Sequence, residues 1–181
     1  MKRYLLILIA VIVLIAAAAL GFHFRQTGTA PQAIPADAAQ KLLSQSFATL
    51  DGKATSLTQW QGKVLVVNFW ATWCPPCREE MPEFSQIQSE SAAKGVQFVG
   101  IAIDTPDNVL KFKQVTQVSY PLIIGSYDTL KLTGELGNNA MALPFTVILD
   151  RSGKIIHTKL GRLSRPELEQ WLAPLVSAMQ S

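Results

Sequence analysis

Cys74 and Cys77 are the only cysteines in this 181-residue chain, and two residues separate them. One helical turn across this gap brings the two sulfurs within disulfide range. The apolar run before them, residues 64–70, is rich in β-branched side chains and indicates a strand buried on both faces. The cysteines then stand where a strand ends and a helix begins. The helix dipole and its unpaired N–H groups favour thiolate over thiol there, which predicts a dithiol that exchanges with disulfides.

The positions of the two cysteines predict different roles. Cys74, at the mouth of the helix, is the expected nucleophile, and Cys77, one turn inside, is expected to resolve the mixed disulfide. Pro75 fits the first helical turn, where a missing N–H costs little. The alternatives are an inert structural disulfide or half of a metal site. A zinc site usually needs four ligands, and the chain has two histidines, so we predict no metal and no cofactor.

Alternating patterns surround the cysteines and predict an α/β fold. A hairpin is expected over residues 47–57, a second buried strand over 96–103, and helices near 107–118 and 129–136 on either side of a short strand at 122–124. Residues 145–149 and 154–160 predict another hairpin, and a capping box at 164–167 opens the last helix. Such an order indicates a sheet with helices on both faces.

Residues 4–22 are apolar and uncharged, and as a helix they would span about 28 Å, close to the hydrocarbon thickness of a bilayer. Basic residues precede them, so residues 1–24 predict a signal anchor in a bacterial inner membrane, with the rest of the chain in the periplasm. The alanines at 16–18 leave open a cleavable signal peptide and a soluble periplasmic protein. Both alternatives place the cysteines in an oxidising compartment.

Residues 25–43, rich in Ala, Gln, Thr and Pro, predict a tether, and the redox domain is expected over residues 44–181. Although the net charge of the chain is +3, acidic and basic residues nearly balance from residue 40 onward. A near-neutral domain argues against binding to nucleic acid.

The segment Asn-Phe-Trp-Ala-Thr-Trp-Cys-Pro-Pro-Cys-Arg-Glu-Glu-Met-Pro, residues 68–82, closely resembles thioredoxin-fold proteins of the TlpA/ResA type. The resemblance covers about residues 44–178. These proteins are exported, usually membrane-tethered thiol–disulfide oxidoreductases. The resemblance therefore implies a thioredoxin-like fold, with a central mixed sheet flanked by helices, an N-terminal hairpin extension and an N-terminal transmembrane helix.

The same resemblance implies further site residues. The proline matching Pro144 is cis in this family and packs beside the active-site sulfurs, and the backbone of Leu143 would pair with a bound substrate chain as an added strand. Trp73 is expected to shield the disulfide or to form part of the docking surface, next to Pro75. We therefore include all four residues in the expected substrate-binding site.

Glu80 follows Cys77 by three residues, so the two share one helix face. Thioredoxins proper carry a buried Asp in the preceding strand, where this chain has Asn68, which cannot exchange a proton. The resemblance implies that Glu80 supplies the missing acid–base group, with a pKa raised by partial burial. Alternatively, Glu79, Glu80 and Glu83 merely favour the positive end of the helix.

The predicted function is that of a membrane-anchored reductase of protein disulfides. The resemblance favours this direction, with haem-site cysteines of apocytochrome c or metal-site assembly among the candidate clients. Such a reductase needs a membrane-embedded thiol electron donor. One alternative is a disulfide oxidant or isomerase of the DsbA type, although its large helical insertion is missing. Another is a non-catalytic Cu or Zn chaperone that uses Cys74 and Cys77.

Overall fold

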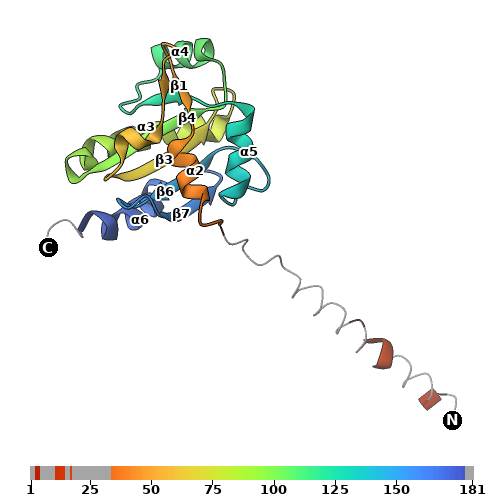
Figure 1. Cartoon of the computed structure of the whole chain (residues 1–181). Helices are drawn as coiled ribbons and strands as arrows, with labels where there is room; N and C mark the ends of the chain where they lie inside the picture. Colours follow the sequence, from red (N-terminus) through yellow and green to blue (C-terminus); the bar gives the residue numbers. More distant parts are fainter. Residues whose placement is uncertain (1–2, 5–10, 15–16, 18–33, 178–181) are drawn as a thin grey trace. The chain divides into compact units, whose positions relative to one another are not determined.

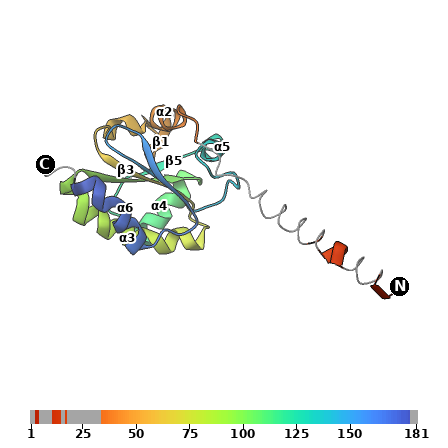
Figure 2. The ribbon, with the colours of Figure 1, turned by 90° about the horizontal axis from the view of Figure 1, so that it is seen from below.

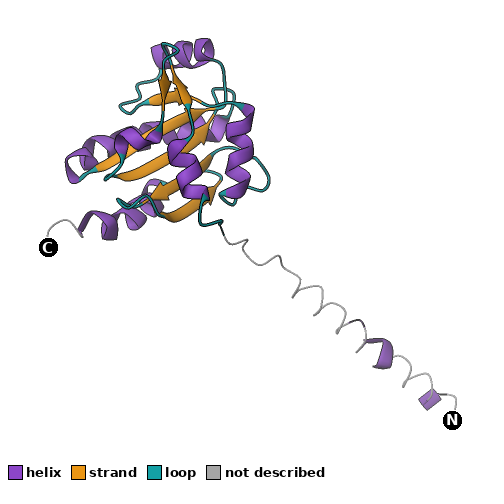
Figure 3. Cartoon of the chain, in the orientation of Figure 1, coloured by secondary structure: helices purple, strands orange, loops and turns teal. Residues whose placement is uncertain are grey.

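The computed structural model describes residues 3–4, 11–14, 17 and 34–177 (Figure 1). The second of the two units of the chain, Ile34–Ser181, contains one seven-stranded sheet (Figure 3). Its strands are β1 (Phe47–Thr49), β2 (Ala54–Thr55), β3 (Val64–Trp70), β4 (Val96–Ala102), β5 (Leu122–Ile124), β6 (Phe145–Leu149) and β7 (Ile155–Leu160). They lie in the order β2-β1-β5-β4-β3-β6-β7. The pairs β3–β4 and β4–β5 are parallel and all other pairs are antiparallel, so the sheet is mixed, as expected.

Helices cover both faces of the sheet (Figure 2). They are α2 (Ala38–Ser44), α3 (Pro75–Ser91), α4 (Pro106–Val115), α5 (Tyr127–Glu135) and α6 (Arg165–Ser177), with 3-10 turns η1 (Leu57–Trp60) and η2 (Ala92–Lys94). Every residue of β3 is buried, and successive side chains point to opposite faces. Val64, Val66 and Trp70 join the core under α3, α4 and α6, while Leu65, Val67 and Phe69 join the core under α2 and α5. The predicted two-sided burial of this strand is confirmed.

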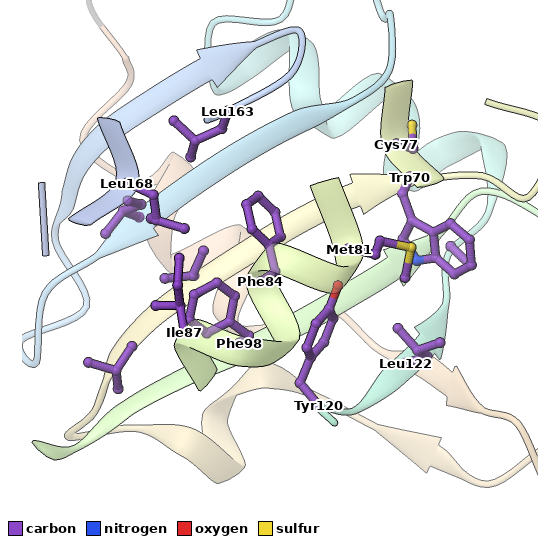
Figure 4. Packing of buried hydrophobic residues seen from close by; sticks show 14 of the residues in the cluster. Trp70, Cys77, Met81, Phe84, Ile87, Phe98, Tyr120, Leu122, Leu163 and Leu168 are labelled. Atoms are coloured by element: carbon purple, nitrogen blue, oxygen red, sulfur yellow. The ribbon is translucent and has the colours of Figure 1, made fainter. Parts of the chain in front are cut away.

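Aromatic rings fix α3 on the sheet (Figure 4). Phe84 of α3 lies 5.5 Å from Phe98 of β4, centroid to centroid, and Phe98 lies 5.8 Å from Tyr120. Trp70, at the end of β3, packs 4.9 Å from Phe112 of α4. Tilted ring pairs at such distances add to the free energy gained from burial. These contacts hold the middle of α3 against β4, and α4 against the C-terminal end of β3.

The register of the strands brings three loops to one edge of the sheet. Phe69 pairs with Ile101 of β4 on one side and with Phe145 of β6 on the other. The segments that follow β3 and β4 and the segment that precedes β6 therefore lie side by side. In an α/β sheet, the edge at the C-terminal ends of the parallel strands is the usual position of a functional site.

The outer helices begin at capping residues that shift their predicted bounds. The helix expected at 107–118 is α4, Pro106–Val115, because the Thr105 side chain accepts a hydrogen bond from the Asn108 N–H. The helix expected at 129–136 begins at Tyr127, because Ser126 and Thr129 form a reciprocal capping box.

Helix α2 lies mostly within the segment predicted as the tether, residues 25–43. Residues 34–44 belong to the folded unit, and Leu42 and Leu43 are buried against the sheet. Lys41 also pairs with Glu135 of α5 at 2.8 Å. The helix is only seven residues long, too short to give a periodic pattern, and tertiary packing stabilises it.

The predicted anchor, residues 1–24, falls mostly outside the described residues, and so does the predicted tether as far as residue 33. Of the helices that the structure describes, none combines the length and the apolar character needed to cross a bilayer.

Candidate active site

The cysteine pair lies at the predicted strand–helix junction. Cys74 is the N-cap residue of α3, with an extended backbone, and forms a disulfide with Cys77, whose Cα lies 5.3 Å away. Pro75 and Pro76 occupy the first two helical positions and have no N–H. The Cys77 amide is therefore the first backbone donor of the helix. When the pair is reduced, this N–H and the positive helix end favour the Cys74 thiolate.

The two sulfurs differ in access. Cys74 is 4% exposed and Cys77 is completely buried, so a reagent that approaches from solvent meets Cys74 first. Trp73 is 67% exposed, and Pro75 is also exposed. The exposed indole and proline ring provide apolar surface on both sides of Cys74.

The Leu143–Pro144 peptide is cis, as the resemblance to the TlpA/ResA type implies. Pro144 immediately precedes β6, whose register places it beside the end of β3. Leu143 packs against the buried cluster that contains both cysteines. The Pro144 carbonyl accepts a hydrogen bond from the Gly161 N–H at 2.8 Å, whereas no bond to the backbone N–H or carbonyl of Leu143 occurs among the described residues. The Leu143 backbone thus has the groups needed to pair with an extended chain.

Glu80 is completely buried one turn beyond Cys77. Its Oε1 accepts a hydrogen bond from Asn68 Nδ2 at 2.7 Å, and its Oε2 accepts one from the Leu163 N–H at 3.0 Å. Burial raises the pKa of this carboxyl to about 7, although the bonds from Leu163 and Asn68 oppose the rise. A carboxyl with this pKa can exchange a proton near neutral pH, and its helix face is that of Cys77.

The neighbouring glutamates have different surroundings. Glu79 is exposed and lies 3.5 Å from Arg162, and Glu83 pairs with the same guanidinium at 3.2 Å. Glu83 also accepts a hydrogen bond from the Arg165 N–H. These carboxylates hold the segment before α6 against α3. Of the three glutamates, only Glu80 is buried. A general preference for acidic residues near a helix N-terminus does not explain this burial.

Asp104, to which the sequence assigned no role, contacts the segment that carries the cysteines. Its Oδ2 accepts hydrogen bonds from the N–H and the hydroxyl of Thr72, at 3.0 and 2.5 Å. An acidic residue directly after a buried parallel strand, at the edge where the cysteines lie, was the signal available in the sequence. In the part of the chain described here, no three His, Cys, Asp or Glu side chains lie close enough together to hold a metal ion.

A mixed α/β sheet with a CxxC disulfide at the β3–α3 junction and a cis proline before β6 defines the class of thioredoxin-fold thiol–disulfide oxidoreductases. The comparisons agree. The chain belongs to the Redoxin family, whose model matches residues 29–172. This membership and the relatives below confirm the resemblance inferred from residues 68–82.

Two relatives and one solved structure illustrate the similarity. Thioredoxin-like protein YneN of Bacillus subtilis (strain 168) is 36% identical over 131 residues, which cover 70% of this chain and 74% of that protein. Thiol-disulfide oxidoreductase ResA of Geobacillus thermodenitrificans is 30% identical over 176 residues, covering 94% and 96%. A thioredoxin-family thiol:disulfide interchange protein from Chlorobium tepidum TLS superposes with a TM-score of 0.65 at 30% identity, covering 73% and 92%. The chain is thus a thiol–disulfide oxidoreductase of the ResA kind.

Proposed function

We propose that this protein is a membrane-anchored periplasmic reductase of protein disulfides. The observation that carries the proposal is the buried Glu80 carboxyl on the Cys77 face of α3, with a pKa of about 7. A dithiol that reduces another disulfide must deprotonate its resolving thiol, and a base with this pKa suits that step at neutral pH.

The reaction begins on the reduced pair. The Cys74 thiolate attacks one sulfur of the substrate disulfide, forms a mixed disulfide and releases the other substrate sulfur as a thiolate, which takes a proton from water. Glu80 then accepts the proton of the Cys77 thiol. The Cys77 thiolate attacks Cys74, forms the Cys74–Cys77 disulfide and releases the second substrate sulfur as a thiolate, which takes a proton from water, while Glu80 returns its proton to water. Two electrons pass from the enzyme to the substrate, and the enzyme ends in the disulfide form seen here.

The substrate docks as an extended chain. The N–H and carbonyl of Leu143, which form no hydrogen bond with any other described residue, support pairing with the residues beside the substrate cysteine, in the manner of an added strand. Exposed Trp73 and Pro75, the residues that flank Cys74 in the sequence, supply apolar contact. Pro144 is buried beside the end of β3, at the base of this site.

The N-terminal segment directs the domain to its compartment in this proposal. Residues 1–24 act as an uncleaved anchor in the inner membrane, supported by the uncharged apolar run at 4–22 and the basic residues before it. A tether keeps the domain at high effective concentration near the membrane. A membrane-embedded thiol carrier then returns two electrons to the disulfide. Haem-site cysteines of apocytochrome c and metal-site cysteines are the client classes that we propose.

The reduction potential of the Cys74–Cys77 couple tests the direction. Equilibration against a dithiol buffer is expected to give a value at or below about −270 mV, the thioredoxin range. A value near −120 mV is typical of a strong oxidant and would overturn the reductase proposal.

Trapping tests the roles of the sulfurs: Cys77→Ser is expected to accumulate a mixed disulfide with substrate, and Cys74→Ser is not. Membrane fractionation with intact-mass analysis tests the anchor.

A further inference from the structure

The short segment between β3 and the cysteines, residues 71–73, forms few hydrogen bonds with the other described residues. The Trp70 carbonyl accepts a hydrogen bond from the Ile103 N–H at 2.8 Å, and the Cys74 N–H donates one to the Ala71 carbonyl at 3.2 Å. Among the described residues, the only side chain outside residues 71–73 that forms a hydrogen bond with this segment is Asp104. Beyond these backbone bonds, one carboxylate supplies the side-chain hydrogen bonds of the turn that leads to Cys74.

The Asp104 carboxylate is itself fixed by the start of α4. Its Oδ1 accepts hydrogen bonds from the Thr105 N–H and from Asn108 Nδ2, both at 2.8 Å, while its Oδ2 accepts the two from Thr72. Burial raises the pKa of Asp104, but the hydrogen bonds from Thr72, Asn108 and Thr105 outweigh it and leave the pKa below its ordinary value. The group is thus ionised at neutral pH, and charge-assisted hydrogen bonds of this kind are among the stronger ones.

We propose that Asp104 is a positioning residue for Cys74, because its carboxylate ties the Thr72 backbone and hydroxyl to the α4 N-terminus and so keeps the Cys74 sulfur at the N-cap of α3. Attack on a disulfide needs the thiolate aligned with the bond it breaks, and small displacements of a reacting atom slow such steps strongly. A turn freed from Asp104 lets Cys74 leave the N-cap geometry. The inference rests on the proposed attack by Cys74.

The test isolates this sulfur by using Cys77→Ser in the full chain, where Cys74 is the only thiol. Its reaction with a chromogenic aromatic disulfide is followed across the titration range of the thiol, which separates the pKa of Cys74 from the rate constant of its thiolate. Asp104→Ala is expected to lower the thiolate rate constant on the order of tenfold. Asp104→Asn keeps one acceptor oxygen, so its thiolate rate constant is expected to lie between those of Asp104→Ala and the parent. Because this assay involves no protein substrate, it stands even if the physiological direction or client is not as proposed.

Matched variants decide between positioning and other effects. Asp107→Ala, in the first turn of α4 and exposed, removes a carboxylate from the same helix and is expected to leave the rate constant unchanged. Thr72→Val removes only the hydroxyl donor. Adding it to Asp104→Ala is expected to lower the rate constant of the Cys74 thiolate no further.

Two results would overturn the proposal. One is a folded Asp104→Ala protein with the parent rate constant and pKa of Cys74. The other is a faster reaction in both Asp104→Ala and Asp104→Asn, which would assign the effect to the charge of Asp104 rather than to its hydrogen bonds. If Asp104→Ala does not fold, Thr72→Val carries the test: a rate constant lowered in the folded variant supports the proposal, and the parent value contradicts it.

Discussion

Asn68 donates a hydrogen bond from Nδ2 to Oε1 of Glu80 at 2.7 Å, and both side chains are almost completely inaccessible to solvent. Asn68 occupies the position at which the resemblance to thioredoxins places a buried Asp. In this protein that strand residue does not carry the proton. It donates a hydrogen bond to Glu80 of α3, the residue that we propose as the acid–base group for Cys77.

Replacing Glu80 tests its role as a base. Glu80 accepts a proton only when ionised, so the rate at which Cys77 resolves a mixed disulfide is expected to rise with pH through about 7 and then level off. Glu80→Gln is expected to slow this step by roughly 100-fold and to abolish the rise near neutral pH. Rapid mixing of the reduced enzyme with an excess of disulfide substrate measures the release of the second thiol.

Glu79→Gln is the matched control. Glu79 is exposed and, among the described residues, its one ion pair is with Arg162 at 3.5 Å, so its loss is expected to leave both the rate and its pH dependence nearly unchanged. Equal small effects of the two substitutions would show that Glu80 has no special part in the reaction.

Burial of Glu80 also predicts how stability changes with pH. The folded protein keeps the proton on Glu80 up to about pH 7, whereas the unfolded chain loses it near the ordinary pKa of 4.5. The contribution of Glu80 to the free energy of unfolding is therefore greatest below the lower value and declines through this window, by about 3 kcal/mol. Urea denaturation across the window should show the decline in the parent and its loss in Glu80→Gln.

The partner of Glu80 offers a second way to move its pKa. Asn68→Ala removes a hydrogen bond that stabilises the ionised carboxylate, so the pH at which resolution is half-maximal is expected to rise by about one unit. Thr146→Val, which removes only the other contact of Asn68 Nδ2, serves as the control and is expected to move this midpoint less. If Asn68→Ala leaves the pH of half-maximal resolution unchanged, the pH dependence of this step does not come from Glu80.

The parts of the site that local residue patterns predict lie in one contiguous stretch, residues 64–77. The two-sided burial of residues 64–70 and the spacing of Cys74 and Cys77 encode the strand, the junction and the disulfide locally. The cis form of the Leu143–Pro144 peptide followed from family resemblance, because a local pattern does not distinguish cis from trans proline.

The remaining features depend on contacts between distant residues. Glu79, Glu80 and Glu83 are chemically identical, and the Leu163 N–H, 83 positions away, helps to single out Glu80. Asp104 meets Thr72 across 32 positions. In both cases the pairing follows from the arrangement of the strands and their loops, which hydrophobic periodicity alone does not give.

Helix α2 is another feature absent from the sequence prediction, and its contribution to stability can be measured. Leu42 is completely buried in the core on the α2 side of the sheet. Leu42→Ala is expected to lower the free energy of unfolding by about 3 kcal/mol, since the cavity adds to the lost burial. Lys41→Ala, which removes exposed ion pairs with Asp37 and Glu135, is expected to cost less than about 1 kcal/mol. Similar small effects in urea denaturation would show that α2 contributes little to the fold.

Replacing Trp73 shows whether its side chain binds substrate or shields the disulfide. Its side chain is 67% exposed, so Trp73→Ala is expected to change the free energy of unfolding by less than about 0.5 kcal/mol. If the indole binds substrate, KM for a protein disulfide rises about tenfold, while the rate with a small aromatic disulfide stays the same. If the indole instead covers the sulfurs, the small reagent reacts faster with the variant. Val115→Ala, which truncates an apolar side chain that is 84% exposed at the end of α4, controls for loss of exposed apolar surface. Because shielding and docking move the small-reagent rate differently, the two assays together assign the role of Trp73.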